Sequence, residues 1–260
     1  MVRKNIAIAI CTLLLVAGSA RAAEENPYFE TVLIPLSLTP AGLPGDFGSL
    51  WRSQILVYNS STEMVPVTQT PATGPIIELP PQPAQPLTMT EISAGTGGQS
   101  VGAIVYVARP GNESVVFSSR IQDVSRQALT WGTEIPVVRE SDLLSVPVDL
   151  LGVPTDSTFR NTLRIYNTDG QNSCGFSISI SHGDGALLKT TTVTVPAAQS
   201  DPVYPIYAGY VQLGDFLPPE PGTDPLRVTI TPLCSAPRYW TFVSVTNNET
   251  QHVTTITPGK

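Results

Sequence analysis

The sequence predicts an all-β protein: two tandem immunoglobulin-like β-sandwich domains after an N-terminal signal peptide. Short runs of Val, Ile, Thr, Tyr and Phe are bounded by Gly and Pro, which interrupt nearly every window long enough for a helix. One strand motif is also written twice, as WRSQILVYN at residues 51–59 and FRNTLRIYN at residues 159–167. A repeat of about a hundred residues built from short strands indicates two similar β-domains rather than one large core.

Residues 1–22 have the pattern of a secretory signal peptide. Arg3 and Lys4 precede an apolar stretch at 6–16, and Ala20-Arg21-Ala22 offers a cleavage site between small residues. The apolar stretch is shorter than the roughly 20 residues that a membrane helix needs. We therefore expect export to the periplasm or the extracellular space, without stable membrane insertion.

The charge balance argues against nucleic acid as a partner. The chain has 14 basic and 21 acidic residues, a net charge of −7, and loss of the signal peptide would make it more acidic. The remaining basic residues are scattered rather than clustered. A surface of this kind repels phosphates, so we expect neither nucleic acid nor anionic membrane to bind.

The repeat divides the mature chain into domains at 23–138 and 139–260. The boundary is the short charged stretch 139–142, which predicts domains held end to end rather than swinging freely. In the first domain we expect strands at 31–38, 49–58, 65–70, 76–79, 87–91, 102–108, 114–122 and 129–137. In the second domain we expect strands at 144–150, 159–166, 175–181, 187–195, 203–208, 227–233, 239–246 and 253–257.

Alternation along the repeated strand predicts which side chains face the core. Counting every second residue from the aromatic that opens each copy gives the inward face, and the intervening Arg and Tyr positions face outward. Trp51 and Phe159 are therefore predicted to anchor the two cores. Aligning residues 110–123 with 235–248 matches Phe117 with Phe242 and predicts a second pair of anchors.

The cysteines predict one disulfide. Cys11 lies within the signal peptide, which leaves Cys174 and Cys234 in the mature chain. An even number of cysteines in an exported protein favours a bridge, and only one pairing exists. A redox or metal role is the alternative, but it lacks the Cys-x-x-Cys spacing that would support it.

Several of these features together resemble a loose group of exported bacterial proteins built from tandem immunoglobulin-like β-sandwiches, with no assigned activity. They are the signal peptide, Ile34-Pro35, the repeated strand, a Pro-broken connection after each copy, and the closing strand FVSVTNN at 242–248. The resemblance implies fold and export. It brings no functional residues with it.

Neither catalytic nor cofactor chemistry stands out, and we predict no enzyme activity, cofactor or metal. His182 and His252 have no second ligand at zinc spacing, no serine lies in Gly-x-Ser-x-Gly, and no carboxylate pair can be nominated. The loops 167–172 and 214–224 carry oxygen ligands, as calcium loops do, but are interpreted as turns. A hydrolase whose site assembles only in space stays open as a third hypothesis.

These observations favour a non-catalytic exported protein used for binding, adhesion or envelope structure, with an extracytoplasmic protein or a glycan as partner. Tyr204, Tyr207 and Tyr210 cluster locally, as glycan-binding rings do, although tyrosines also cover sheet edges. The alternative is a periplasmic chaperone or assembly factor that pairs a strand edge with its client. Such factors usually have a basic cleft and dissimilar domains, whereas this chain is acidic and repeated.

Overall fold

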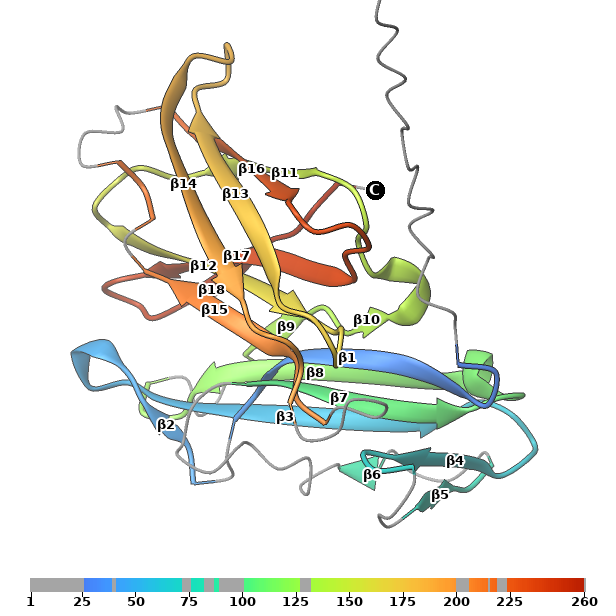
Figure 1. Ribbon diagram of the computed structural model, residues 1–260. Helices are drawn as coiled ribbons and strands as arrows, with labels where there is room; N and C mark the ends of the chain where they lie inside the picture. Colours follow the sequence, from blue (N-terminus) through green and yellow to red (C-terminus); the bar gives the residue numbers. More distant parts are fainter. Residues whose placement is uncertain are drawn as a thin grey trace, which may run out of the picture.

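The computed structural model describes residues 26–38, 41–71, 76–81, 87–88, 101–126, 132–199, 206–214, 216–218 and 224–259. Over these residues the chain is nearly all β, with three short 3-10 turns between strands of antiparallel sheets (Figure 1). The predicted all-β class is confirmed. The predicted signal peptide lies outside the described residues.

The N-terminal half forms two sheets. One has the strand order β10-β1-β7-β4-β5, and the other has the order β2-β3-β8-β9, with β6 also paired to β3. The strands are β1 (Phe29–Ser37), β2 (Leu43–Pro44), β3 (Leu50–Asn59), β4 (Val65–Thr68), β5 (Ile77–Leu79), β6 (Leu87–Thr88), β7 (Val101–Ala108), β8 (Val115–Asp123), β9 (Thr133–Ile135) and β10 (Val138–Arg139).

The C-terminal half also forms two sheets, in the orders β11-β16-β13-β14 and β15-β12-β17-β18. The strands are β11 (Val148–Val153), β12 (Phe159–Asn167), β13 (Cys174–Ser181), β14 (Leu187–Val195), β15 (Gly209–Leu213), β16 (Leu226–Pro232), β17 (Tyr239–Asn247) and β18 (Val253–Ile256).

The repeat in the sequence is also a repeat of topology. The strands β1 and β3 to β9 pair with one another in the same pattern as β11 to β18. In each half the second of these eight strands lies beside the fifth, and the third beside the sixth, as in an immunoglobulin sandwich. The first and seventh strands have exchanged places relative to that fold, because the first pairs with the sixth and the seventh with the second.

Most expected strands are present, with small shifts at their ends. The strand expected at 203–208 is wrong: residues 206–208 contain only isolated bridges, from Tyr207 to Ala103 and to Gln199, and the strand β15 follows them. Residues 203–205, together with the ends of the strands expected at 87–91 and 129–137, lie outside the described residues.

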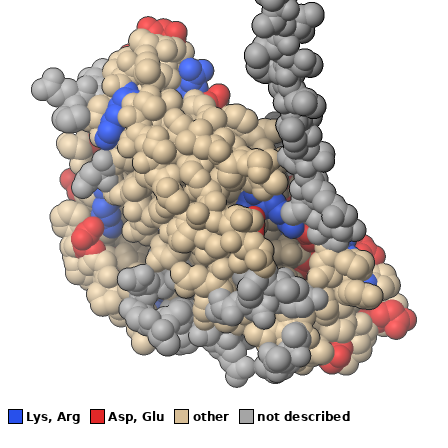
Figure 2. Space-filling view, viewed as in Figure 1, with Lys and Arg blue, Asp and Glu red and all other residues tan. Residues whose placement is uncertain are grey.

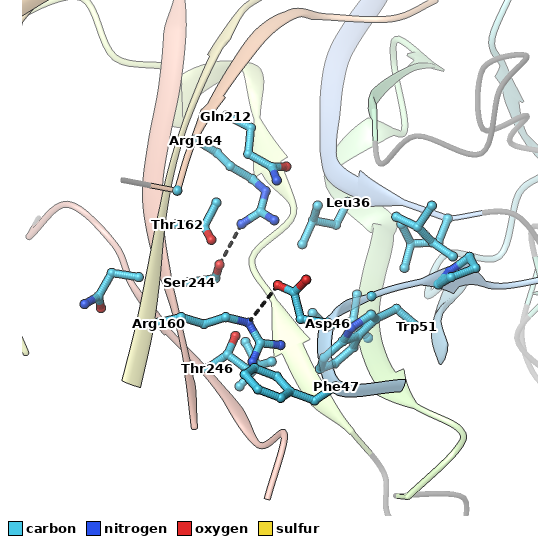
Figure 3. Close-up of a pocket in the computed structure, with 18 of the residues that line it drawn as sticks. Leu36, Asp46, Phe47, Trp51, Arg160, Thr162, Arg164, Gln212, Ser244 and Thr246 are labelled. Carbon is cyan, nitrogen blue, oxygen red and sulfur yellow. Dashed lines mark hydrogen bonds and ion pairs between the residues drawn. The ribbon is translucent and has the colours of Figure 1, made fainter. Parts of the chain in front are cut away.

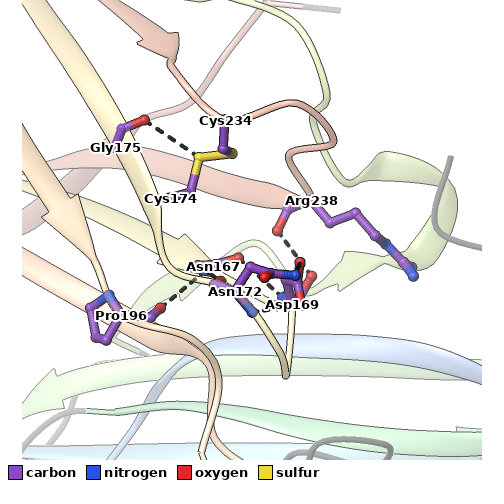
Figure 4. The surroundings of a disulfide bond; sticks show 9 residues. Asn167, Asp169, Asn172, Cys174, Gly175, Pro196, Cys234 and Arg238 are labelled. Atoms are coloured by element: carbon purple, nitrogen blue, oxygen red, sulfur yellow. Dashed lines mark hydrogen bonds between the residues drawn. A yellow bond between two sulfur atoms is a disulfide. The ribbon is translucent and has the colours of Figure 1, made fainter. Parts of the chain in front are cut away.

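Each half has its own apolar core between its two sheets. In the N-terminal half this core includes Val32, Ile55 and Val105, and in the C-terminal half it includes Leu163 and Phe176. The second core also contains Cys174, whose predicted disulfide with Cys234 is confirmed, with an S–S distance of 1.99 Å (Figure 4). The bridge ties the start of β13 to the loop before β17.

A third apolar cluster joins the two halves. It contains Leu33 and Ile104 from the outer face of one N-terminal sheet, and Tyr166 and Phe242 from the outer face of a C-terminal sheet. The Tyr166 hydroxyl donates a hydrogen bond to the backbone carbonyl of Pro35 at 2.5 Å. The halves are therefore packed over a broad face of each, rather than joined only end to end as the short linker suggested.

Charged side chains reinforce this contact at the boundary between the halves. The buried carboxylate of Glu140 accepts hydrogen bonds from Arg109 of the N-terminal half, at 3.1 Å, and from Arg238 of the C-terminal half, at 2.8 Å. It also accepts one from the backbone N–H of Thr31 at 2.9 Å. One residue of the linker therefore binds side chains of both halves and holds them against each other.

The predicted inward face is confirmed in the middle of the repeated strand, but the predicted anchors at its start are wrong. Ile55 and Leu163 are buried in the two cores. Phe159 is 37% exposed, and Trp51 is only half-buried, against the cluster between the halves. Both aromatics lie near the end of a strand, where the opposite sheet no longer covers them.

The predicted equivalence of Phe117 and Phe242 is wrong by one residue. Phe117 pairs with Val57 and packs against the N-terminal core, whereas Phe242 pairs with Arg164 on the outward face of its sheet. The strand registers instead match Phe117 with Thr241. A shift of one residue reverses the side of the sheet, so Phe242 is buried between the halves instead of inside its own half.

Candidate functional site: a cleft between the two halves

A cleft of about 790 Å³ opens where the two halves meet (Figure 3). Its volume lies in the range of small-molecule sites. The side contributed by the C-terminal half is mostly polar, and consists of Arg160, Asn161, Thr162, Arg164, Gln212, Gly214, Ser244, Thr246, Asn248 and Val253. The side contributed by the N-terminal half is mostly apolar, and consists of Leu36, Leu38, Leu43, Pro44, Gly45, Asp46, Phe47, Trp51 and Ile121.

The polar side is built on the outward face of β12. Arg160, Thr162 and Arg164 alternate with residues that face the C-terminal core, so their side chains stand on the same side of the sheet. Ser244 of β17 lies opposite Thr162, and Gln212 of β15 lies opposite Arg164. Three adjacent strands therefore present guanidinium, hydroxyl and amide groups side by side.

Arg160 is held in place from several directions. Its guanidinium donates to Asn248 Oδ1 at 3.1 Å and to Gln251 Oε1 at 2.6 Å, lies 5.5 Å from the centre of the Phe47 ring, and has Asp46 Oδ2 3.9 Å from its Nε. Burial lowers the pKa of Arg160 from its usual value, and the charge of Asp46 opposes this. Two of its five N–H donors are thus used in hydrogen bonds inside the protein.

Arg164 is the less satisfied of the two arginines. Its Nη1 donates to Ser244 Oγ at 2.6 Å, and its guanidinium lies 5.7 Å from the centre of the Phe242 ring. Among the described residues it has no ion-pair partner, and its buried Nε has no hydrogen-bond acceptor. Burial lowers the pKa of Arg164, yet arginine stays charged at neutral pH.

The opposite wall carries an exposed aromatic in a strained backbone conformation. Phe47 is 61% exposed and has a φ of 55°, the left-handed region that residues with a Cβ rarely adopt. Arg126 donates a hydrogen bond to its backbone carbonyl. The only other non-glycine residue with positive φ among those described is Gln251, and both contact Arg160. Strain of this kind clusters at functional sites.

Close packing shapes the same wall below Phe47. A Cβ on Gly45 would lie 2.6 Å from Nε1 of Trp51 and 2.6 Å from the Ser49 hydroxyl oxygen, so only glycine fits there. Trp51, predicted as a core anchor, thus supports the cleft wall instead.

The cleft stands out against a sparsely charged surface. In the view of Figure 2, most of the C-terminal half is uncharged, and its lysines, arginines and acids lie as separate spots toward the edges. Two arginines on one strand therefore form an unusual concentration of positive charge for a chain with a net charge of −7. The lining also contains Asp46, so one carboxylate stands against the two arginines.

The cleft lining carries few groups for acid–base or nucleophilic chemistry. Its described lining contains one carboxylate, Asp46, and neither histidine nor cysteine, so it offers no acid–base pair and no activated nucleophile. Nowhere in the described part of the chain do three His, Cys, Asp or Glu side chains gather as a metal site would require. In the same residues, no helix is long and apolar enough to cross a membrane.

The other candidates from the sequence are not brought together here. In the loop 167–172, the Asp169 carboxylate accepts the backbone N–H groups of Gln171 and Asn172, as expected for a turn. In the loop 214–224, Asp215 and Glu220 lie outside the described residues, as does Tyr204. Tyr207 and Tyr210 are partly buried, and Tyr210 stacks on Tyr166 at 6.2 Å.

The sequence did contain a signal for Arg164. The two copies of the repeated strand have residues of similar character at their inward positions. At two outward positions the residue is identical, since Arg52 corresponds to Arg160 and Tyr58 corresponds to Tyr166. At the second of the two outward positions between them, the first copy has Leu56 and the second copy has Arg164. A charge that replaces an apolar residue in one copy only indicates a position with its own role.

No family model, no curated protein and no solved structure matches the chain. The fold and the cleft are therefore the basis for any functional conclusion.

Proposed function

We propose that this chain is an exported, non-catalytic binding protein, with a role in adhesion or envelope structure, that holds its ligand in the cleft between its halves. In this proposal residues 1–22 are a cleaved signal peptide, and the halves are two immunoglobulin-like β-sandwich domains with exchanged outer strands. The partner is an extracytoplasmic protein or glycan. A disulfide is compatible with the oxidising compartments outside the cytoplasm.

One observation carries the proposal: Arg164 stands in the wall of a large cleft without an acidic partner among the described residues. A partly buried charge that the protein leaves unpaired costs stability, and so favours a role outside folding. The packing between the halves supports the proposal as well, because a preformed cleft binds without paying for domain closure.

Affinity capture tests it. Tagged mature chain is cross-linked in the envelope of the producing cell, and its captured material is compared with that of Thr162→Trp, which places a bulky ring in the cleft beside Arg164. The matched control is Gln54→Trp, at the equivalent and exposed position of the first copy. We expect capture by the natural chain and Q54W, and its loss in T162W. Equal capture by all three would place the binding surface elsewhere.

A second function is favoured by β14. This nine-residue strand ends its sheet, and its first residue, Leu187, is 64% exposed. The last strand of a sheet is the surface that a chaperone or assembly factor offers to a client strand. In that case T162W would still capture the client, and the backbone amides of β14 would gain protection from hydrogen exchange in the complex.

A further inference from the structure

The cleft joins two kinds of surface that a single ligand would have to match. On one side the Arg164 guanidinium lies among the hydroxyl of Ser244, the hydroxyl of Thr162 and the amide of Gln212 (Figure 3). On the other side stand Leu36, Leu38 and the ring of Trp51. The first surface suits an anion, and the second suits an apolar body.

The anion is expected to carry a single charge. Arg160 already donates to two side-chain oxygens and has the Asp46 carboxylate 3.9 Å from its Nε, whereas Arg164 has no acidic neighbour among the described residues. This leaves one guanidinium, Arg164, for the ligand. A planar guanidinium matches a carboxylate in shape and donor spacing, whereas a phosphate dianion is usually met by more than one cation or by backbone N–H groups.

We propose that the cleft binds a small carboxylic acid with an apolar body, with the carboxylate on Arg164 and Ser244 and the body against the Leu36–Leu38 and Trp51 wall. This inference rests on the proposed binding function and adds the chemistry of the ligand. The ligand would supply the negative charge that the described part of the chain does not provide for Arg164. Its apolar part would cover the half-buried ring of Trp51, since Leu36 and Leu38 are already buried.

The experiment is a calorimetric titration of the disulfide-intact mature chain with three probes. Decanoate has both features, acetate has only the carboxylate, and decan-1-ol has only the apolar body. We expect saturable one-to-one binding of decanoate and binding at least about tenfold weaker for each of the other two, because each lacks one of the two contacts. Equal binding of decanoate and decan-1-ol would overturn the role of the carboxylate.

Variants locate the site. Arg164→Leu introduces the residue that the first copy has at this position, and we expect it to weaken decanoate binding by about ten- to a hundredfold, the range for loss of a charge-assisted hydrogen bond. Arg52→Leu removes the same charge from an exposed position outside the cleft and should leave the affinity unchanged. If R52L weakens binding as much as R164L does, the charge acts from a distance and the assignment is wrong.

A second measurement separates binding from folding. Because a partly buried guanidinium without an acidic partner costs stability, R164L should unfold at the same temperature as the natural chain, or higher, in the absence of ligand. Decanoate should raise the melting temperature of the natural chain more than that of R164L at the same ligand concentration. A large loss of stability in R164L without ligand would make Arg164 a structural residue and overturn the proposal.

The outcomes also distinguish this inference from the function on which it rests. If T162W abolishes capture from the envelope but decanoate does not bind, the cleft is a binding site for another chemistry and only the inference fails. If T162W captures as the natural chain does, the proposed cleft function itself fails.

Discussion

Replacing Tyr166 by Phe removes one hydroxyl from the centre of the contact between the halves. The ring is fully buried, stacked between Tyr210 and Phe242, with ring centres 6.2 and 6.3 Å away. Its hydroxyl donates to the carbonyl of Pro35, in a stretch of β1 where the ladder to β7 is irregular, between Ile34 and Ser37. Phe fills the same space, so the substitution tests the hydrogen bond alone.

The cost follows from burial. Pro35 is buried, so its carbonyl cannot turn to bulk water when the donor is lost. An unsatisfied buried acceptor costs about 1–3 kcal/mol, and we expect Tyr166→Phe to lower the free energy of unfolding by about 2 kcal/mol. The repeat offers a matched control. Tyr58 is the equivalent residue of the first copy and is partly exposed, so Tyr58→Phe should cost less than about 0.5 kcal/mol.

Urea denaturation, followed by tryptophan fluorescence and by circular dichroism, measures both variants. Y166F should move the midpoint to lower urea by both probes, and Y58F should leave it in place. The reasoning is refuted if Y166F and Y58F unfold at the same urea concentration, because the hydroxyl would then contribute nothing to the contact. Separation of the two probes in Y166F alone would mean that the halves have begun to unfold independently.

Three further predictions concern the whole fold. Replacing Cys174 and Cys234 by Ala should lower the free energy of unfolding by about 4 kcal/mol, from the 60-residue separation, measured by urea denaturation against the disulfide-intact natural chain. Glu140→Gln should cost about 3 kcal/mol in the same assay, since two arginines lose their shared carboxylate; a cost below about 0.5 kcal/mol would contradict its role in joining the halves. Burial raises the pKa of Tyr166 and of Tyr239 above the usual value near 10, so their contribution is complete below that pH and declines above it, as tyrosines ionise first in the unfolded chain. Alkaline titration of unfolding should show this decline, and it should be shallower in Y166F.

The sequence predicted the features of the fold that are determined by a local pattern. Alternation assigned Ile55 and Leu163 to the cores, and the parity of the cysteines gave the disulfide, because both depend on features within reach of one strand or one pairing. The repeat also carried over to the strand order. These predictions required no knowledge of how the halves meet.

The contact between the halves could not be predicted, because it does not depend on a local pattern. Alternation tells which residues leave a sheet on its outer face, but not whether that face meets water or another domain. Tyr166 was therefore expected to be partly exposed, although it is fully buried. The one-residue error for Phe242 has the same origin, since an aromatic on either face of β17 meets apolar neighbours and the sequence pattern does not separate the two cases.

Because the sheet that contains β12 is covered on both faces, the charge of Arg164 on its outward face requires an explanation. Tyr166, Trp240 and Phe242 are outward side chains of the covered sheet, and they belong to the cluster that holds the halves together. An apolar residue at position 164, like the Leu56 of the first copy, would extend that cluster. The chain instead places a charge there and keeps a cleft of about 790 Å³ in front of it. Since both features reduce the apolar contact between the halves, they are best explained by a ligand that restores it.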